Sequence, residues 1–564
     1  MSKSIIKRGA AALWLGLGMS LVSCSGFLDR EANSYIDKDM TFSSYIRTQQ
    51  YLTNIYTLLP DGLTRMDGNA MFDAATDDAE FALQTAEVQS FNTGAWNAAT
   101  NPDNPWDRCY MGIRMACELM DHADEVNLDA YRLDPKTHTE YENRKKDIRI
   151  WKAEARFLRA FFHFELLKRF GPVPIVKSSL SISGDYSGMV RPSMDECVKF
   201  IVNECDTAAK YLDLKPWRDD TALGHATKGA ALALKSRVLL YAASPLYLDY
   251  ENLDETNLPT NAEKWELAAK AAKAVIDLGA YQLATSYGQL FQNQFQSTEY
   301  IFMRRYTVSD NVEKANFPVS FGGTGGTNPS VNLLDSYEMT DGTDFSWTNP
   351  TQAANPYADR DSRMDATFLF NEQNFHNGKV ECYIGGKDGL YQTNATTTGH
   401  YLRKYLNESV NIQTGGGKLG HTFPFFRLAE IYLNYAEALN EYAPDNADIA
   451  RYVNLVRERA DQHPLPSGLT QDEMRQRIRR ERRVELAFEE HRAWDVRRWK
   501  IASTTLGAPL RGLRIERDNT QATPTYTYTP YVVERRAFQP KMYWYPIPQS
   551  ELMKLVGWKQ NPQW

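Results

Sequence analysis

Several aromatic residues lie in loop-like sequence beside polar side chains, a combination that suits the recognition of sugars. Trp96 lies between Asn92 and Asn97 in the segment FNTGAWNAATNPDNPW, which is rich in Gly, Ala, Asn and Thr. A sugar ring has an apolar C–H face and a rim of hydroxyl groups. An exposed aromatic plane flanked by amide, carboxylate or guanidinium groups can therefore bind it. Trp96 is the first candidate platform for such a ligand.

Other residues of the same chemical kinds follow along the chain. The further candidate platforms are Trp347, Tyr357 and Tyr391, and the candidate polar partners are Asp77, Asp78, Asn97 and Arg360. Each aromatic side chain has an alternative role, which is to pack between a loop and the core. The Asn-Pro-Tyr context of Tyr357 favours that alternative. Asp77 and Asp78 can likewise cap or brace a loop.

Paired carboxylates that could cleave a glycosidic bond are not evident in the sequence. Glu489 and Glu490 are adjacent, and on the helix expected here their side chains point about 100° apart. A glycosidase needs two carboxyl groups that face one another across the bond, about 5–9.5 Å apart. The repeat of Glu481, Glu485 and Glu489 at intervals of four instead predicts a ladder of charges along one side of a helix.

Other catalytic motifs are missing as well. The chain has neither GxSxG nor HExxH, and its nine His are scattered without the spacing of metal ligands. Gly415-Gly416-Gly417-Lys418 is followed by Leu419 where a phosphate-binding loop needs Ser or Thr. We therefore predict a binding protein without enzyme activity and without a cofactor. A structural Ca²⁺ ion among the Asp-rich loops stays open, because those loops lack EF-hand spacing.

The composition is that of a globular protein. Of 564 residues, 43% are hydrophobic and 24% are charged, which provides enough apolar material for a large core. The formal net charge is −7, whereas a nucleic-acid-binding surface would be basic. The length allows three or four domains of about 150 residues, or fewer large ones.

The N-terminus has the pattern of an export signal. Lys3, Lys7 and Arg8 precede the apolar stretch 9–22, which is shorter than the roughly 20 residues of a membrane-spanning helix. Leu21-Val22-Ser23-Cys24 resembles the bacterial lipobox. That resemblance implies removal of residues 1–23 and a lipid on Cys24, so the chain would be anchored to a membrane without crossing it. An ordinary signal peptide with an incidental cysteine is the alternative.

Five cysteines remain after Cys24. They are Cys109, Cys117, Cys197, Cys205 and Cys382. The first two pairs are each eight residues apart in helical sequence, a rise of about 12 Å that no disulfide can bridge. We expect all five to be buried as small hydrophobic side chains.

Helical periodicity dominates the chain, and two long irregular segments interrupt it. Candidate helices cover about 42–59, 103–122, 142–170, 193–212, 224–243, 261–279, 422–442, 446–461 and 470–500. Segments 224–243 and 261–279 pair as a helical hairpin, as do 422–442 and 446–461, which favours a tetratricopeptide-like stack. Segments 60–101 and 281–421 are instead rich in Gly, Asn, Thr and Pro, with brief strand candidates such as EYIFMRRY. Long irregular excursions on a helical frame are typical of ligand-binding surfaces.

A series of motifs then resembles the SusD/RagB family of surface lipoproteins in Bacteroidota. The motifs are Phe27-Leu28-Asp29, Ala75-Thr76-Asp77-Asp78, the helix from Trp151 to Ala160 with Arg169-Phe170-Gly171-Pro172, Lys228-Gly229-Ala230-Ala231, Asn355-Pro356-Tyr357 with Arg360-Asp361-Ser362-Arg363, Arg427-Leu428-Ala429-Glu430, Glu481 to Glu489 with Arg492 to Trp499, Tyr545-Pro546-Ile547-Pro548 and Asn561-Pro562. They occur in the family's order over nearly the whole mature chain.

The resemblance implies a fold and a role. The fold is mostly α, with four tetratricopeptide-like helix pairs and a packed region of loops and short strands. We expect a single domain over 24–564, with its helical scaffold at about 42–59, 103–279 and 422–500 and its variable excursions at about 60–101 and 281–421. The implied role is to bind oligosaccharides or polysaccharides at the cell surface of the outer membrane and to deliver them to a SusC-like TonB-dependent transporter. Uptake of peptides, as in the RagB-like branch, is the alternative, and an adaptor with little ligand affinity is another.

Overall fold

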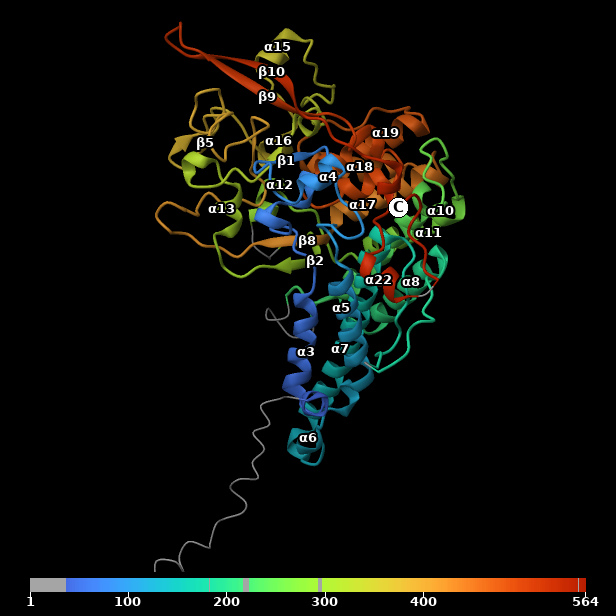
Figure 1. The fold of residues 1–564 in the computed structure, drawn as a ribbon. Helices are drawn as coiled ribbons and strands as arrows, with labels where there is room; N and C mark the ends of the chain where they lie inside the picture. Colours follow the sequence, from blue (N-terminus) through green and yellow to red (C-terminus); the bar gives the residue numbers. More distant parts are fainter. Residues whose placement is uncertain (1–36, 182, 217–222, 293–296, 556) are drawn as a thin grey trace, which may run out of the picture.

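Long helices form the frame of the molecule in the computed structural model, which describes residues 37–181, 183–216, 223–292, 297–555 and 557–564 (Figure 1). The longest helix is α7 (His138–Phe170), whose 33 residues span about 50 Å. The other long helices are α3 (Tyr45–Thr57), α5 (Trp106–His122), α8 (Met194–Tyr211), α9 (Lys228–Ala243), α11 (Ala262–Ile276), α17 (Leu428–Tyr442), α18 (Asp448–Arg459) and α19 (Gln471–Glu485). The protein is mostly helical, which confirms the predicted fold class.

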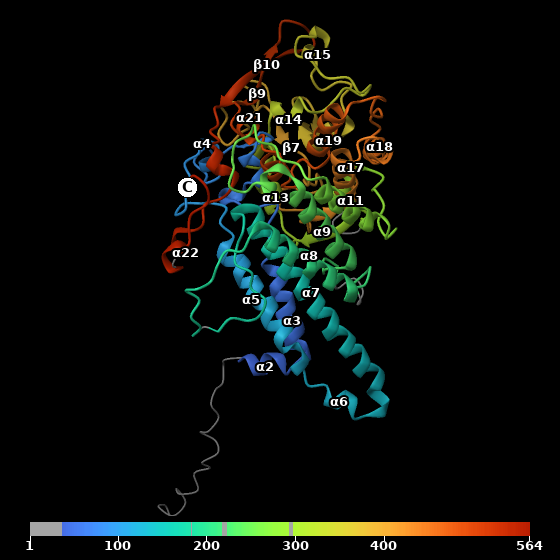
Figure 2. The same ribbon diagram turned by 90° about the vertical axis from the view of Figure 1, so that its right-hand side faces the viewer.

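Most of these helices pack against their neighbours in sequence. α5 packs on α7, α7 on α8, α8 on α9 and α9 on α11 (Figure 2). α11 then packs on α17, which in turn contacts α18 and α19. The chain between α11 and α17 therefore leaves the stack and returns to it. This order is consistent with the tetratricopeptide-like arrangement expected from the helix pairs.

Local signals explain where several of these helices begin. The Ser193 hydroxyl and the Glu196 carboxylate form a capping box at the start of α8. Thr227 caps α9 and Asn261 caps α11 through their side-chain oxygens. Past the end of α11, Gly279 adopts a φ of +61°, a conformation that glycine reaches without steric cost.

Two of the expected helices have different boundaries. Residues 422–427 were expected to be helical but form strand β8 (Thr422–Arg427), because TFPFFR is rich in β-favouring aromatic residues and contains a proline. The helix expected over 470–500 is interrupted after Glu485, and α20 (Arg492–Arg498) follows it. Phe488 and Glu490 have φ values of +61° and +60° in the intervening turn, which a continuous helix cannot contain.

Within the described residues, short strands pair into five two-stranded sheets. The pairs, all antiparallel, are β1 (Ala79–Phe81) with β3 (Thr327–Pro329), β2 (Tyr300–Arg305) with β8, β4 (Phe368–Leu369) with β7 (Tyr401–Leu402), β5 (Asn374–Phe375) with β6 (Gly378–Lys379), and β9 (Leu510–Asp518) with β10 (Thr525–Glu534). The strand expected in EYIFMRRY is β2. The β1–β3 pair joins the two irregular segments, because Glu80 lies opposite Asn328.

The β9–β10 hairpin projects from the end of the molecule opposite α6 (Asp129–Arg132), as Figure 1 shows. Its register places Tyr528 opposite Ile515 and Tyr531 opposite Gly512. These two strands were not predicted from the sequence. The remaining short helices are α2 (Lys38–Phe42), α4 (Gln89–Thr93), α10 (Pro245–Leu248), α12 (Tyr287–Gln292), α13 (Asn311–Asn316), α14 (Val331–Leu334), α15 (Pro350–Ala354), α16 (Ser362–Thr367), α21 (Ala502–Thr505) and α22 (Gln549–Lys554), with short 3₁₀ turns between elements.

The five cysteines after Cys24 are all buried and unpaired, as predicted. Burial raises the pKa of the Cys109 thiol to about 12, so this thiol stays protonated and apolar in character at neutral pH. Cys24, the predicted lipidation site, lies outside the described residues. Within the part of the chain that the structure describes, no helix is both long enough and apolar enough to span a bilayer.

Candidate ligand-binding site

Trp96 is a core residue, and its predicted role as an exposed platform is wrong. Only 3% of its surface is exposed. Its ring lies 5.0 Å from each of the rings of Phe91, Tyr545 and Trp564, measured between centroids. The indole therefore joins the first irregular segment to the C-terminal end of the chain. A large aromatic side chain that finds three aromatic neighbours gains more from burial than from facing water.

Asn97 lies beside this cluster but has a local role. Its residue is exposed, and its side-chain oxygen accepts hydrogen bonds from the backbone N–H groups of Ala99 (2.8 Å) and Thr100 (3.2 Å). Asparagine commonly stabilises a turn in this way. The predicted pairing of Asn97 with an exposed Trp96 is thus not observed.

Asp77 and Asp78 brace a loop, which was the structural alternative for them. Asp77 is buried and accepts hydrogen bonds from Arg483 and Arg492, while Asp78 accepts one from Arg483 at 2.7 Å. Burial opposes ionisation of Asp77, but the two guanidinium groups outweigh it and lower the pKa of its carboxyl group. These carboxylates are engaged inside the protein and are not available to an external ligand.

Arg360 and Tyr357 are also interior residues. Arg360 donates to the carbonyl oxygens of Pro356 (2.8 Å), Leu334 (2.6 Å) and Tyr337 (2.8 Å), so its guanidinium organises the backbone around it. Tyr357 stacks on Phe370 with their ring centroids 4.1 Å apart. The predictions that these two side chains bind ligand are wrong, since both are buried by the loops they hold together.

Trp347 is half-buried, with its polar edge already engaged. Its indole Nε1–H donates to Asp335 at 3.0 Å, and Asp335 also pairs with Arg511 of β9 at 2.6 Å. One edge of the Trp347 ring packs against Phe345. The side chain fixes a loop beside the hairpin and retains partial access to solvent.

Tyr391 is the predicted platform that the structure presents to solvent. It is 81% exposed, the largest exposed fraction among the large hydrophobic side chains in the described residues. Its φ is +77°, a left-handed conformation that costs a non-glycine residue roughly 1–2 kcal/mol. The next three residues, 392–394, are exposed too. The exposed aromatic ring and its polar neighbours are therefore accessible to a ligand.

Two residues that were not predicted from the sequence extend this region, since Tyr531 lies near Tyr391 and Arg514 lies near Tyr531. Tyr531 of β10 is half-buried, and its hydroxyl group donates to the carbonyl oxygen of Thr397. Burial, together with the nearby Tyr391 hydroxyl, raises the pKa of Tyr531 to about 12, while the Arg514 guanidinium opposes that rise. Arg514 itself is exposed on β9. The alternation in TYTYTPY was the available signal for a strand that carries tyrosines here.

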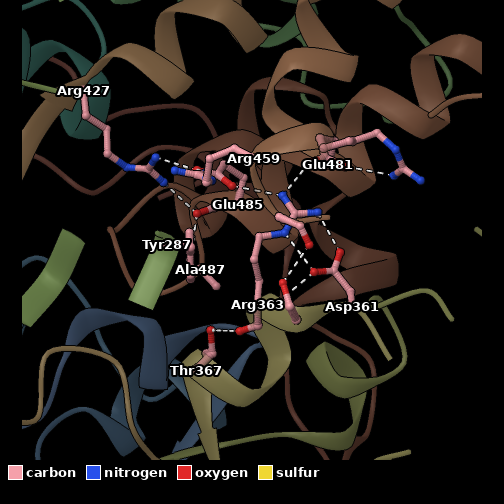
Figure 3. A network of polar contacts seen from close by, with 12 residues as sticks. Tyr287, Asp361, Arg363, Thr367, Arg427, Arg459, Glu481, Glu485 and Ala487 are labelled. Carbon is pink, nitrogen blue, oxygen red and sulfur yellow. Dashed lines mark hydrogen bonds and ion pairs between the residues drawn. The ribbon is translucent and has the colours of Figure 1, made fainter. Parts of the chain in front are cut away.

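The charged side chains of α19 form an internal network of ion pairs. Glu485 accepts from Arg427, Arg459 and Arg363, and Arg363 also binds Asp361 at 2.7 Å (Figure 3). Each of these side chains is nearly inaccessible to solvent. The three guanidinium groups lower the pKa of Glu485 against the opposing effect of its burial. The network joins α19 to the preceding strand and loops, and its role is structural.

Glu489 and Glu490, which were excluded as a catalytic pair, lie in the turn after α19 and not on a helix. Glu489 binds Arg427 at 2.6 Å and Lys404 at 2.7 Å, whereas Glu490 binds Arg65 at 2.6 Å. Both line a hollow of only about 20 Å³, which is room for a water molecule and not for a sugar ring. Among the described residues, no group of three or more His, Cys, Asp or Glu side chains is placed to hold a metal ion.

The chain matches two protein-family models. One, described as the SusD family, matches residues 288–564. The other, described as starch-binding and associating with the outer membrane, matches residues 26–240. Together the two models cover both ends of the helical frame and the β9–β10 hairpin.

Individual relatives agree with these matches. SusD-like protein P2 of Formosa agariphila is 26% identical over 437 residues, which cover 75% of this chain and 76% of that protein. A crystal structure of a SusD-like protein from Bacteroides fragilis is 25% identical, covers 94% of this chain and 99% of its own, and superposes with a TM-score of 0.77. A second structure from that organism, of a SusD-like carbohydrate-binding protein, is 26% identical, covers 91% of this chain and 99% of its own, and has a TM-score of 0.74.

Proposed function

The chain belongs to the SusD family, and from this premise we propose that it is a lipoprotein of the outer-membrane surface that binds a glycan and delivers it to a SusC-like TonB-dependent transporter. The observation that carries the proposal is Tyr391, an aromatic ring held in a strained backbone conformation and exposed to solvent. The related Bacteroides fragilis structure described as carbohydrate-binding supports the same ligand class.

The surface around Tyr391 has the chemistry that a sugar requires. The ring offers an apolar plane for the C–H face of a pyranose, and Gln392, Thr393 and Asn394 offer hydrogen-bonding groups beside it. Tyr531 and Arg514 of the hairpin add a second ring and a cation close by. Because Tyr531 is anchored to Thr397, the hairpin holds this side of the surface in place.

The absence of enzyme activity belongs to the same proposal. The acidic side chains that could act as proton donors, Glu481, Glu485 and Glu489, are bound to arginine or lysine within the protein. A glycosidase would need one carboxyl group poised to donate a proton and a second one facing it across an open cleft. The protein would therefore hold its ligand without cleaving it.

Native gel electrophoresis in gels that contain single polysaccharides tests the ligand class and the site. The chain would be produced from Ser25 onward, without the lipid. We expect retarded migration in at least one polysaccharide, loss of that retardation for Tyr391→Ala, and normal retardation for Tyr211→Ala. Tyr211 is the matched control, because it is 51% exposed but lies on α8.

The possible results separate the alternatives. Retardation that persists in Tyr391→Ala would move the site elsewhere. If no polysaccharide retards the protein and calorimetry detects binding of short peptides, the RagB-like alternative replaces the glycan. Purification of the full-length chain from outer membranes tests the transporter partner and the lipid anchor. A large outer-membrane protein should copurify, and Cys24→Ala should lower the amount of the chain in the membrane fraction.

A further inference from the structure

A groove unrelated to the Tyr391 surface lies at the end of the molecule that carries α6. It holds about 750 Å³, a size typical of ligand sites, and lies between the turn before α6, the first half of α7 and the end of α8. In Figure 1 this end lies far from the β9–β10 hairpin, at the other pole of the molecule. Nothing in the proposed function uses it.

Four aliphatic side chains form the floor of the groove, and the rings of Tyr141 and Tyr211 also line it. Val126, Leu128, Ile148 and Ala153 line it and are buried by the surrounding helices. At its edge Leu133, which follows the last residue of α6, is 70% exposed. Together with the aliphatic floor, this exposed leucine offers an apolar surface for a hydrocarbon chain.

The rim of the groove carries an excess of positive charge. Five cations line the groove, namely Arg132, Lys145, Arg149, Lys152 and Arg156, against the three carboxylates of Asp124, Asp129 and Glu142. Each of these carboxylates is paired with a rim cation, in Lys152–Asp124, Arg132–Asp129 and Lys145–Glu142.

The other two rim cations are Arg156 and Arg149. Arg156 shares the single carboxylate of Glu204 with Arg159, at 2.8 Å and 2.6 Å. Arg149 is exposed and has no ion pair with any described residue. An anionic group at the rim would neutralise this excess.

The groove also lies beside the start of the described chain. The turn that forms its wall packs against α2, and the backbone N–H of Asn127 donates to the carbonyl oxygen of Ser43 at 3.0 Å. Residues 24–36 connect Cys24 to this point, and 13 residues span at most about 45 Å when extended. A lipid on Cys24 would thus keep the groove within reach of a bilayer. Ile46, at the start of α3, adds an apolar side chain that is 62% exposed at this end.

We propose that this groove binds an anionic phospholipid of the membrane to which the chain is tethered, with the phosphate at Arg149 and an acyl chain along the aliphatic floor. This inference rests on the proposed function in one respect. The lipid anchor at Cys24 brings the groove close to the membrane that supplies the phospholipid. The groove would hold the α6 end of the protein toward the bilayer.

Vesicle flotation tests this inference with the chain that begins at Ser25, so that no covalent lipid contributes. We expect the protein to float with vesicles that contain phosphatidylglycerol and to stay behind with vesicles of phosphatidylcholine alone. Loss of one cation near an anionic surface weakens binding about fivefold, and Arg149→Glu should have at least that effect. Leu133→Asp should reduce flotation as well. Lys270→Glu, an exposed cation on α11, is the matched control and should float normally.

The flotation results test lipid binding in the groove and do not depend on the glycan site. Absence of flotation by the unaltered chain, equal flotation with both vesicle types, or flotation unchanged in Arg149→Glu and Leu133→Asp would each overturn the inference. If Arg149→Glu does not fold, Arg149→Gln replaces it. Retardation in polysaccharide gels should be the same for Arg149→Glu and the unaltered chain, so a failure of glycan binding and a failure of lipid binding are distinguishable.

Discussion

Asp77 and Arg492 form a two-pronged ion pair between parts of the chain that are distant in sequence. Nε of Arg492 donates to Oδ1 of Asp77 at 2.8 Å, and Nη2 donates to Oδ2 at 2.8 Å. Arg483 adds a third contact, at 2.9 Å. The pair ties the first irregular segment to α20, and through it that segment is held against the C-terminal half of the frame.

We expect Asp77→Ala to destabilise the protein strongly. The substitution leaves Arg492 without its close buried partner and Arg483 with Asp78 alone, and removing one member of a buried ion pair costs about 3–5 kcal/mol. Urea unfolding followed by circular dichroism measures the change. Asp472→Ala breaks an exposed pair with Arg475 and should cost about 1 kcal/mol or less. Equal effects of the two substitutions would contradict a bracing role for Asp77.

Trp96→Ala should behave as a core truncation. Loss of a large buried aromatic side chain typically lowers the free energy of unfolding by about 3–5 kcal/mol. Any loss of polysaccharide retardation should then be proportional to the unfolded fraction. If the variant keeps its melting temperature but no longer binds polysaccharide, Trp96 belongs to the binding surface. That result would contradict the core role assigned from its contacts with Phe91, Tyr545 and Trp564.

Tyr391→Gly should separate stability from binding. Glycine relieves the left-handed strain at this position, worth roughly 1–2 kcal/mol, and loses part of that gain through its greater freedom in the unfolded chain. We expect the unfolding free energy to stay the same or rise by about 1 kcal/mol while retardation in polysaccharide gels disappears. A drop of several kcal/mol would mean that the ring packs in the core.

Glu437 should make stability depend on pH in the acid range. Although burial opposes its charge, Arg498 and Arg482 lower its pKa to about 2. The carboxyl group has a pKa of about 4.3 in the unfolded chain, so the unfolded chain binds more protons between these values. Its contribution is complete above about pH 5 and is lost as the pH falls toward 2.

Glu437→Gln should therefore flatten the acid limb of the stability profile. Between pH 6 and pH 3 the unaltered chain should lose about 2 kcal/mol more from this one group than the variant does. The free energy of unfolding at each pH is obtained from the midpoint and slope of a urea unfolding curve, and the two proteins are compared at several pH values. Parallel profiles for the two proteins would mean that Glu437 titrates normally in the folded state.

The sequence alone determined the features that depend on local pattern. Helical periodicity predicted the α9–α11 and α17–α18 pairs, and the polarity of the capping residues agrees with where α8, α9 and α11 begin. The spacing of the cysteines excluded disulfides within the first two pairs, and the five are free. These properties follow from neighbours within a few turns of the chain, so no tertiary information is needed to read them.

Only the tertiary structure decided which side chains meet water. Trp96 and Tyr391 both lie in loop-like segments rich in small polar residues, yet one contacts Tyr545 and Trp564 and the other faces solvent. The break between α19 and α20 was equally invisible, because Phe488 and Glu490 take left-handed conformations that place Glu489 against Arg427. Burial is set by residues hundreds of positions away, and a local pattern cannot contain that information.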